Sequence, residues 1–320
     1  MFHRVFPPEP KPLILGYHRI ADEAVDPWSL AVSPTHFEEQ LLALRRTRHP
    51  LPLTEFVDHL IADTLPANAV ALTFDDGYVD NLVAAKPRLS AADVPATVFL
   101  ATGYIGRLEP FWWDELARLV LRENAPLSFE LVVRGEAMRI DYDTEFVEGE
   151  DGPIERRHAA LLRIWEALRP LEDEERRSIM IELESIFSRR DHRRTLGRAM
   201  TREEVRALVA EGLVAIGAHT VTHPQLSRLG AAACHREITE SKRACETFAG
   251  ASVTAFAYPY GDFDADARET VKAAGFAFAC SMQRGPVTAA SDIFALPRIH
   301  VRNLDGDAFE RVLRSASTTA

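Results

Sequence analysis

The feature that most constrains the fold of this chain is an alternation of short apolar runs with amphipathic helical stretches. A helical stretch at 34–46 follows the first run, and another at 79–90 follows the second. This order of strand and helix predicts a parallel sheet or a barrel. Several runs end in polar residues, and in barrels the active site lies beyond the carboxyl ends of the strands. The runs of strand length occupy residues 13–18, 70–74, 96–100, 214–218, 255–258, 276–280 and 296–301.

The alternation breaks between about residues 106 and 198. A chain of 320 residues can bury a large core, as one α/β barrel or as two smaller domains. We expect a single domain over residues 1–320, with the 106–198 stretch as an α+β insertion rather than an independent domain. The stretch contains the aromatic cluster 111–113, hairpin-like runs at 128–133 and 137–142, and charged helical stretches near 153–168 and 173–188.

Charge and composition exclude several kinds of partner. The formal net charge of −11 argues against nucleic acid or an anionic membrane surface as the main partner. No apolar run approaches the length of a membrane-spanning helix. The odd number of cysteines (Cys234, Cys245 and Cys280) fits a reducing compartment. Residues 1–10 lack the apolar core of a signal peptide, so we expect a cytoplasmic protein. The sequence leaves open whether the chain has a protein partner.

Two stretches far apart in the sequence carry metal-binding side chains. Thr73-Phe74-Asp75-Asp76-Gly77 places two adjacent carboxylates after an apolar run, and His219-Thr220-Val221-Thr222-His223-Pro224 offers two imidazoles. One carboxylate and two imidazoles suit zinc or a similar divalent ion and leave coordination positions open. The second carboxylate is then free to act as a base. If the two stretches meet in the fold, they predict a hydrolase.

Each stretch also has an ordinary explanation. Adjacent strand residues point to opposite faces, so both aspartates can serve one site only at a sharp turn, which Gly77 indicates. The alternative is a turn that merely caps the next helix. The histidine pair could be two surface residues, and it lacks the glutamate of the zinc-protease signature. Non-haem iron oxygenases also use two histidines and a carboxylate, but the spare Asp75 favours hydrolysis.

Together, the two stretches resemble the motifs of the polysaccharide deacetylase family, the group with the NodB-homology domain (carbohydrate esterase family 4-like). Thr-Phe-Asp-Asp-Gly and His-(Ser/Thr)-x-x-His-Pro are both unchanged and stand in the family's order. The resemblance covers roughly residues 70–105 and 205–301. It implies an α/β fold, a distorted (β/α) barrel, carrying the inserted segment. It also implies a metal-dependent hydrolase that removes an N-acetyl group from an amino sugar in a glycan or glycan precursor.

The resemblance also assigns roles to the residues of the two motifs. Asp76, His219 and His223 would be the ligands of a divalent metal ion, zinc in the first place. Asp75 would be the general base that takes a proton from the attacking water. Two alternatives stay open. One is a hydrolase of another non-peptide C–N bond on a non-carbohydrate substrate, and the other is a catalytically silent carbohydrate-binding member.

The other catalytic parts match the family less closely. Ala257-Tyr258-Pro259-Tyr260-Gly261 resembles the family's Arg-x-Pro-Tyr-Gly, and by analogy the backbone N–H of Tyr260 would help hold the oxyanion. The family's arginine, which orients the base, is replaced here by Ala257. We hypothesise that Arg298, from another strand, orients Asp75 instead.

The general acid has two candidates. His300 lies near the end of the domain, where many family members carry a Leu-x-His, and in a regular strand it shares a face with Arg298. His18 ends the first apolar run and competes for the same role. Either residue could instead line the site without a catalytic role.

Overall fold

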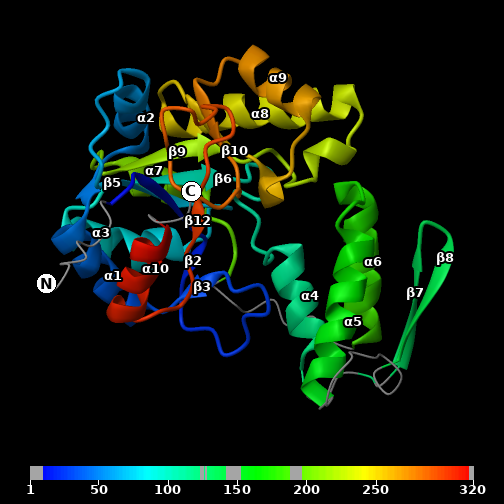
Figure 1. The fold of residues 1–320 in the computed structure, drawn as a ribbon. Coiled ribbons are helices and arrows are strands. Elements are labelled where there is room, and N and C mark those ends of the chain that lie inside the picture. Colours follow the sequence, from blue (N-terminus) through cyan, green and yellow to red (C-terminus); the bar gives the residue numbers. More distant parts are fainter. Residues whose placement is uncertain (1–9, 123–125, 127, 142–152, 188–196, 317–320) are drawn as a thin grey trace, which may run out of the picture. The chain divides into compact units, whose positions relative to one another are not determined.

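The computed structural model describes residues 10–122, 126, 128–141, 153–187 and 197–316 (Figure 1). The chain divides into two compact units. The first combines residues 1–106 with 200–320, and the second spans 107–199. The predicted single domain with an insertion at about 106–198 stays a prediction. No helix among the described residues is both long enough and apolar enough to span a membrane.

The first unit is built on one parallel sheet. Every strand pair in this sheet is parallel, so each connection is a crossover, which explains the helices between strands. A short side strand, β4 (His49–Pro50), pairs with β5. The predicted α/β fold, a distorted (β/α) barrel, is confirmed. The strand order is β11 (Phe278–Cys280), β10 (Ala255–Ala257), β9 (Val214–Ala218), β6 (Ala96–Leu100), β5 (Ala69–Phe74), β1 (Leu13–Tyr17) and β12 (Ile299–His300).

The central strands are continuous apolar runs because both faces of the sheet are buried. All residues of β1, β5 and β6 are buried. On β1, Leu13, Leu15 and Tyr17 belong to one core cluster, together with buried residues of the surrounding helices. Ile14 belongs to the second cluster, in which Ala69 and Ala71 of β5 also lie. The two clusters therefore occupy the two faces of the sheet.

The helices of the first unit begin at recognisable caps. The Ser33 hydroxyl accepts the N–H of His36 (3.2 Å) at the start of α1, and Thr201 with Glu204 forms a capping box at the start of α7. The predicted helix at 79–90 is a π-helical turn, η1 (Asn81–Ala85), followed by α3. The α-helices are α1 (Pro34–Thr47), α2 (Leu53–Ile61), α3 (Lys86–Ala92), α7 (Arg202–Val209), α8 (Ala231–Ala249), α9 (Ala265–Ala273) and α10 (Gly306–Ala316). Shorter elements are β2 (Arg19–Ile20), β3 (Ala31–Val32), η2 (Leu226–Arg228) and η3 (Pro259–Gly261).

Residues 296–300 link the two edges of the sheet. Leu296 forms a parallel bridge with Cys280 of β11, and the N–H of Arg298 donates to the carbonyl of Gln283 (2.9 Å). Ile299 and His300 then pair with β1. The strand predicted at 296–301 is therefore shorter than expected, because its two ends pair with different neighbours. This crossing places Arg298 where the barrel closes.

In the second unit, taken by itself, the described residues form a hairpin and three helices. Strands β7 (Ser128–Val133) and β8 (Glu136–Asp141) pair around Arg134 and Gly135, both with positive φ. The helices are α4 (Trp112–Val120), α5 (Pro153–Leu168) and α6 (Asp173–Ile186). The hairpin and the two charged helices match the predicted elements, whose last residues Tyr142 and Ser188 lie outside the described residues. The aromatic cluster 111–113 is buried.

Candidate active site

Asp75 and Asp76 follow β5 and serve a single site because the chain turns at this point. The backbone enters the left-handed region at Asp76 (φ +72°) and stays there at Gly77 (φ +81°). A Cβ at Gly77 would lie 2.7 Å from Cδ2 of Leu100, so glycine suits both the turn and the packing. The turn directs Asp75 towards Arg298 and Asp76 towards the two histidines.

Three buried side chains from two strand ends form a constellation that could hold a metal ion. Asp76, His219 and His223 each offer one ligand atom, and these atoms lie within 4.8 Å of one another. Oδ1 of Asp76 is 3.7 Å from Nε2 of His219 and 3.4 Å from Nε2 of His223. Ligands about 2.1 Å from a tetrahedral zinc ion stand about 3.4 Å apart, so the spacing fits such an ion. Three protein ligands leave a position for water or substrate.

A hydrogen bond orients the imidazole of His219 for this purpose. Nδ1 of His219 lies 2.7 Å from the carbonyl oxygen of Ala257. A proton on Nδ1, donated to that carbonyl, leaves the lone pair of Nε2 directed at the metal position. Burial lowers the pKa of His219 and so favours the neutral imidazole, which is the form that binds metals. The backbone N–H of His223 donates to the hydroxyl of Thr220 (3.0 Å), which fixes the main chain at this ligand rather than its ring.

Glu237 of α8 fixes the loop between the two histidines. Its carboxylate accepts the N–H of Val221 (2.7 Å), the N–H of Thr222 (2.9 Å) and the hydroxyl of Thr222 (2.7 Å). These contacts hold the backbone on which both imidazoles depend. Sequence reasoning missed this role, because nothing in the sequence separates Glu237 from the other charged residues of its helix.

Arg298 lies against Asp75 in the interior of the barrel. Nη1 and Nη2 of Arg298 donate to Oδ1 and Oδ2 of Asp75, both at 2.7 Å. Nη1 also donates to the hydroxyl of Thr73 (3.1 Å), and Nε donates to the carbonyl of Ser281 (2.9 Å). The guanidinium of Arg298 lies 3.8 Å from the position that a Cβ at Gly16 would take. A side chain at residue 16 that extends beyond Cβ would therefore compete with the guanidinium for space. Arg298 thus lies where the orienting hypothesis requires, while its role in catalysis stays a prediction.

The ion pair sets the protonation state of Asp75. Burial raises the pKa of this carboxyl, but the charges of Arg298 and His219 and the hydrogen bonds of Arg298 outweigh burial. The pKa of Asp75 is therefore held well below its usual range. Burial alone would lower the pKa of Arg298. The charge of Asp75 outweighs burial, so the pKa of Arg298 is raised. Asp75 is a carboxylate throughout the neutral range, the state that a general base requires.

Replacing Arg298 by methionine is expected to destabilise the chain by about 3–5 kcal/mol at pH 7, because it leaves a buried, unpaired carboxylate. The pair stabilises the fold fully above the pKa of the unfolded carboxyl, about 3.9, and this stabilisation is lost as pH falls through the folded pKa. The difference between the free energies of unfolding of wild type and variant should therefore narrow only below about pH 4. Urea unfolding at pH 7 and at about pH 3 measures this difference. Arg302→Met, at an exposed arginine, is the control, and equal stability of the two variants would contradict a structural role for the pair.

His18 and His300 lie beside Asp75. Nε2 of His18 is 4.0 Å from Oδ2 of Asp75, and the rings of the two histidines are 5.4 Å apart. Nε2 of His300 is 2.9 Å from the carbonyl oxygen of Ser29. Burial lowers the pKa of both rings, in His18 to about 3. The structure thus brings both candidates for the general acid to the base.

Tyr260 belongs to the same strand-end region. It lies in η3 with φ +58°, and its ring centroid is 4.5 Å from that of His223. Within the described part of the chain, eight non-glycine residues have positive φ, and Asp76, Thr220, His223 and Tyr260 are four of them. Such backbone is costly and persists where the surrounding structure enforces it, which happens mainly at functional sites. The concentration marks this region as the candidate active site.

Both motifs fall within a match to one protein family. The family described as polysaccharide deacetylase matches residues 62–125 and 188–279, which include Asp75, Asp76, His219 and His223. The chain matches the polysaccharide deacetylase family. The predicted resemblance is confirmed, and it supports a hydrolase that deacetylates a carbohydrate. Among curated proteins, none matches the sequence.

Several solved structures share the fold of this chain. The deacetylase PplD of Streptococcus pyogenes, solved with acetate, is 18% identical with a TM-score of 0.61, over 96% of this chain and 99% of that one. IcaB from Ammonifex degensii is 19% identical with a TM-score of 0.61, over 97% and 98%. BC0361, a polysaccharide deacetylase from Bacillus cereus, is 18% identical with a TM-score of 0.59, over 95% and 69%.

The family match covers only part of the candidate active site. Tyr260 lies within the matched residues, whereas His18, Arg298 and His300 lie outside them. Arg298 directly precedes β12, His300 lies in β12, and His18 directly follows β1. The fold alone brings Arg298 and His18 to Asp75 and His300 to His18. The partner of the base and the candidate acids therefore belong to the part of the site that the family match does not cover.

Proposed function

We propose that this chain, which matches the polysaccharide deacetylase family, is a metal-dependent N-deacetylase that hydrolyses the acetamide of an amino sugar, with Asp75 as general base. One observation carries the proposal. An ionised carboxylate, held on both oxygens by Arg298, stands next to a constellation of Asp76, His219 and His223 that fits a divalent ion. The use of zinc and a cytoplasmic location stay predictions.

Each residue of the candidate site has its own role in the proposed reaction. Asp76, His219 and His223 would hold the ion, which when bound lowers the pKa of water and polarises the carbonyl under attack. Asp75 accepts a proton from water as the oxygen adds to the acetyl carbon, and Arg298 keeps the carboxylate aligned. The backbone N–H of Tyr260 donates to the developing oxyanion. The C–N bond then breaks, a histidine protonates the amine, and acetate and the amino sugar leave.

His300 is the histidine we expect to protonate the amine. Burial lowers the pKa of both rings but lowers that of His18 further, to about 3, so His18 is the less able to hold a proton at neutral pH. His300→Ala should lower kcat by about 10²-fold, within the usual range for general acid catalysis, and leave the metal content intact. Steady-state kinetics and metal analysis of His300→Ala, His18→Ala and the remote, exposed His235→Ala test this. Full turnover in His300→Ala would pass the role to His18 or to solvent.

The function itself is tested by incubating metal-loaded protein with a panel of N-acetylated saccharides and measuring released acetate. Acetate release that disappears in Asp75→Asn supports the proposal. Release of another product from a non-carbohydrate amide would favour the alternative of a different C–N hydrolase. Saccharide binding without release of any product would favour a silent, carbohydrate-binding member.

A further inference from the structure

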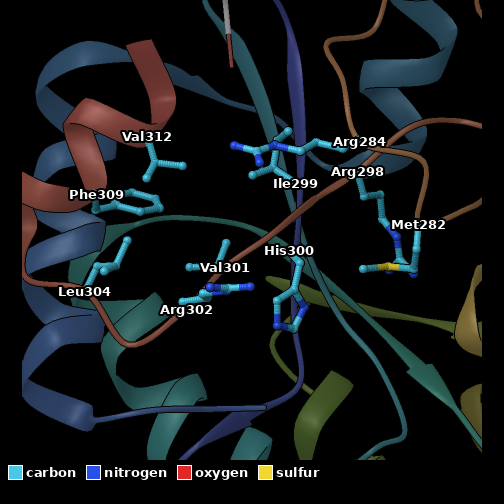
Figure 2. Close-up of a pocket in the computed structure, with 10 residues that line it drawn as sticks. All are labelled: Met282, Arg284, Arg298, Ile299, His300, Val301, Arg302, Leu304, Phe309 and Val312. Carbon is cyan, nitrogen blue, oxygen red and sulfur yellow. The ribbon is translucent and has the colours of Figure 1, made fainter. Parts of the chain in front are cut away.

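A cavity of about 410 Å³ adjoins the candidate active site, and it shares Arg298 and His300 with that site. This volume falls within the range of small-molecule sites. The cavity lies where the end of β11, the strand β12 and the helix α10 approach one another (Figure 2). Arg298 binds both oxygens of Asp75, so this one side chain connects the cavity with the candidate general base.

The walls of the cavity are of two kinds. Leu304, Phe309 and Val312 form an apolar wall at and before α10, and Figure 2 shows them on the side away from Met282 and Arg298. Such a wall suits the C–H face of a sugar ring or an alkyl substituent. The polar groups gather at the opposite side and in the centre, where Figure 2 shows His300 and Arg302.

The charge of the cavity is positive in a chain whose net charge is −11. Arg284 and Arg302 both line it and are exposed, and no described residue forms a hydrogen bond or an ion pair with either side chain. By contrast, Arg298 is neutralised by Asp75. No aspartate or glutamate is among the residues that line the cavity. Two guanidinium groups without a partner among the described residues therefore line a cavity whose lining contains no acidic side chain.

We propose that Arg284 and Arg302 bind an acidic substituent, a carboxylate or a phosphate, of the N-acetylated carbohydrate whose acetamide is presented to Asp75. The proposal rests on the proposed function and adds the substrate class to it. Guanidinium groups pair well with carboxylates and phosphates, since their planar N–H donors match two oxygens at once. The apolar wall would contact the sugar ring, and the two arginines would fix the end that carries the charge.

Calorimetric titration tests the proposal with three probes: N-acetylglucosamine, its 6-phosphate, and N-acetylmuramic acid, which carries a carboxylate. The proteins are the wild type and the Arg284→Gln, Arg302→Gln and doubly substituted variants. Arg311→Gln, at an exposed arginine of α10 outside the cavity lining, is the matched control for the change in charge. Thermal unfolding shows whether each variant is folded. If the double variant does not fold, the loss of preference in the two single variants tests the proposal.

An acidic sugar should bind the wild type about 10-fold more tightly than the neutral sugar for each arginine that contacts it. The preference should fall in each single variant, vanish in the double variant, persist in Arg311→Gln and shrink at 1 M salt. Comparison of the affinities for the 6-phosphate and for N-acetylmuramic acid shows whether the site prefers a phosphate or a carboxylate. Equal affinities in the wild type, or a preference that survives in the double variant, would overturn the proposal.

Failure of the acidic subsite can be distinguished from failure of the proposed deacetylase function. Binding is measured on protein from which metal has been removed by a chelator, so that the sugars are not hydrolysed, and a chain that releases no acetate can still show or lack the preference for acidic sugars. Normal acetate release together with equal affinities would contradict the acidic subsite alone. Absence of acetate release from every sugar would contradict the proposed function alone.

Discussion

Asp75→Asn should lower kcat by about 10²–10⁴-fold, the usual contribution of a general base, while the protein retains its metal. Asparagine keeps the shape of the side chain but cannot accept a proton from water. The metal content should persist because Asp76, His219 and His223 are unchanged. Acetate release and metal analysis measure the two effects, with Asp58→Asn, at an exposed residue of α2, as the control. Wild-type turnover in Asp75→Asn would exclude Asp75 as the base.

The same substitution should also destabilise the protein, because it leaves the guanidinium of Arg298 buried without its counter-charge. The expected loss is about 3–5 kcal/mol. Removing both charges in Asp75→Asn with Arg298→Met should recover most of this stability, since a buried pair replaced as a whole costs little. Turnover should not recover. Stability restored without activity would separate the chemical role of Asp75 from its structural one, whereas restored turnover would contradict the assignment.

The sequence predicted the strand ends of this site because burial on both faces makes parallel strands continuous apolar runs. The runs at 70–74 and 214–218 end at the residues where β5 and β9 end, so the motif residues were placed correctly. The helix α8 was harder to foresee. Its buried residues Cys234, Ser241 and Cys245 follow helical spacing, but their side chains are too weakly apolar for a clear periodic signal.

The contacts around Asp75 lie beyond the reach of any local sequence pattern. Arg298 is 223 positions from Asp75, and it reaches Asp75 only because residues 296–300 pair with β11 at one end and β1 at the other. The carboxylate of Glu237 reaches the loop of the histidines only through the placement of α8. The cavity with Arg284 and Arg302 likewise exists only once the barrel has closed. Long-range packing decides all of these contacts, so the sequence could suggest Arg298 as a candidate but could not establish its position.

His219→Ala should abolish stable metal binding and lower turnover by about 10³-fold or more, since a bound ion supplies several kcal/mol to the transition state. The variant removes one of three ligands whose spacing of 3.4 and 3.7 Å suits a tetrahedral ion. Metal analysis after dialysis and acetate release measure the effects. His235→Ala, which removes an exposed histidine on α8, is the matched control. One equivalent of metal and normal turnover in His219→Ala would exclude this constellation as the metal site.

A readout other than activity separates a metal ligand from a residue that only supports the fold. A ligand that binds the native state alone raises the melting temperature, so added zinc should stabilise the wild type and His235→Ala but not His219→Ala. Glu237→Gln should give an intermediate result, with metal affinity reduced about 10–100-fold, because Glu237 acts on the backbone of the histidine loop. Equal stabilisation of all four proteins by zinc would mean that the ion binds elsewhere. A graded response, from wild type through Glu237→Gln to His219→Ala, is the pattern that only a site built on these residues produces.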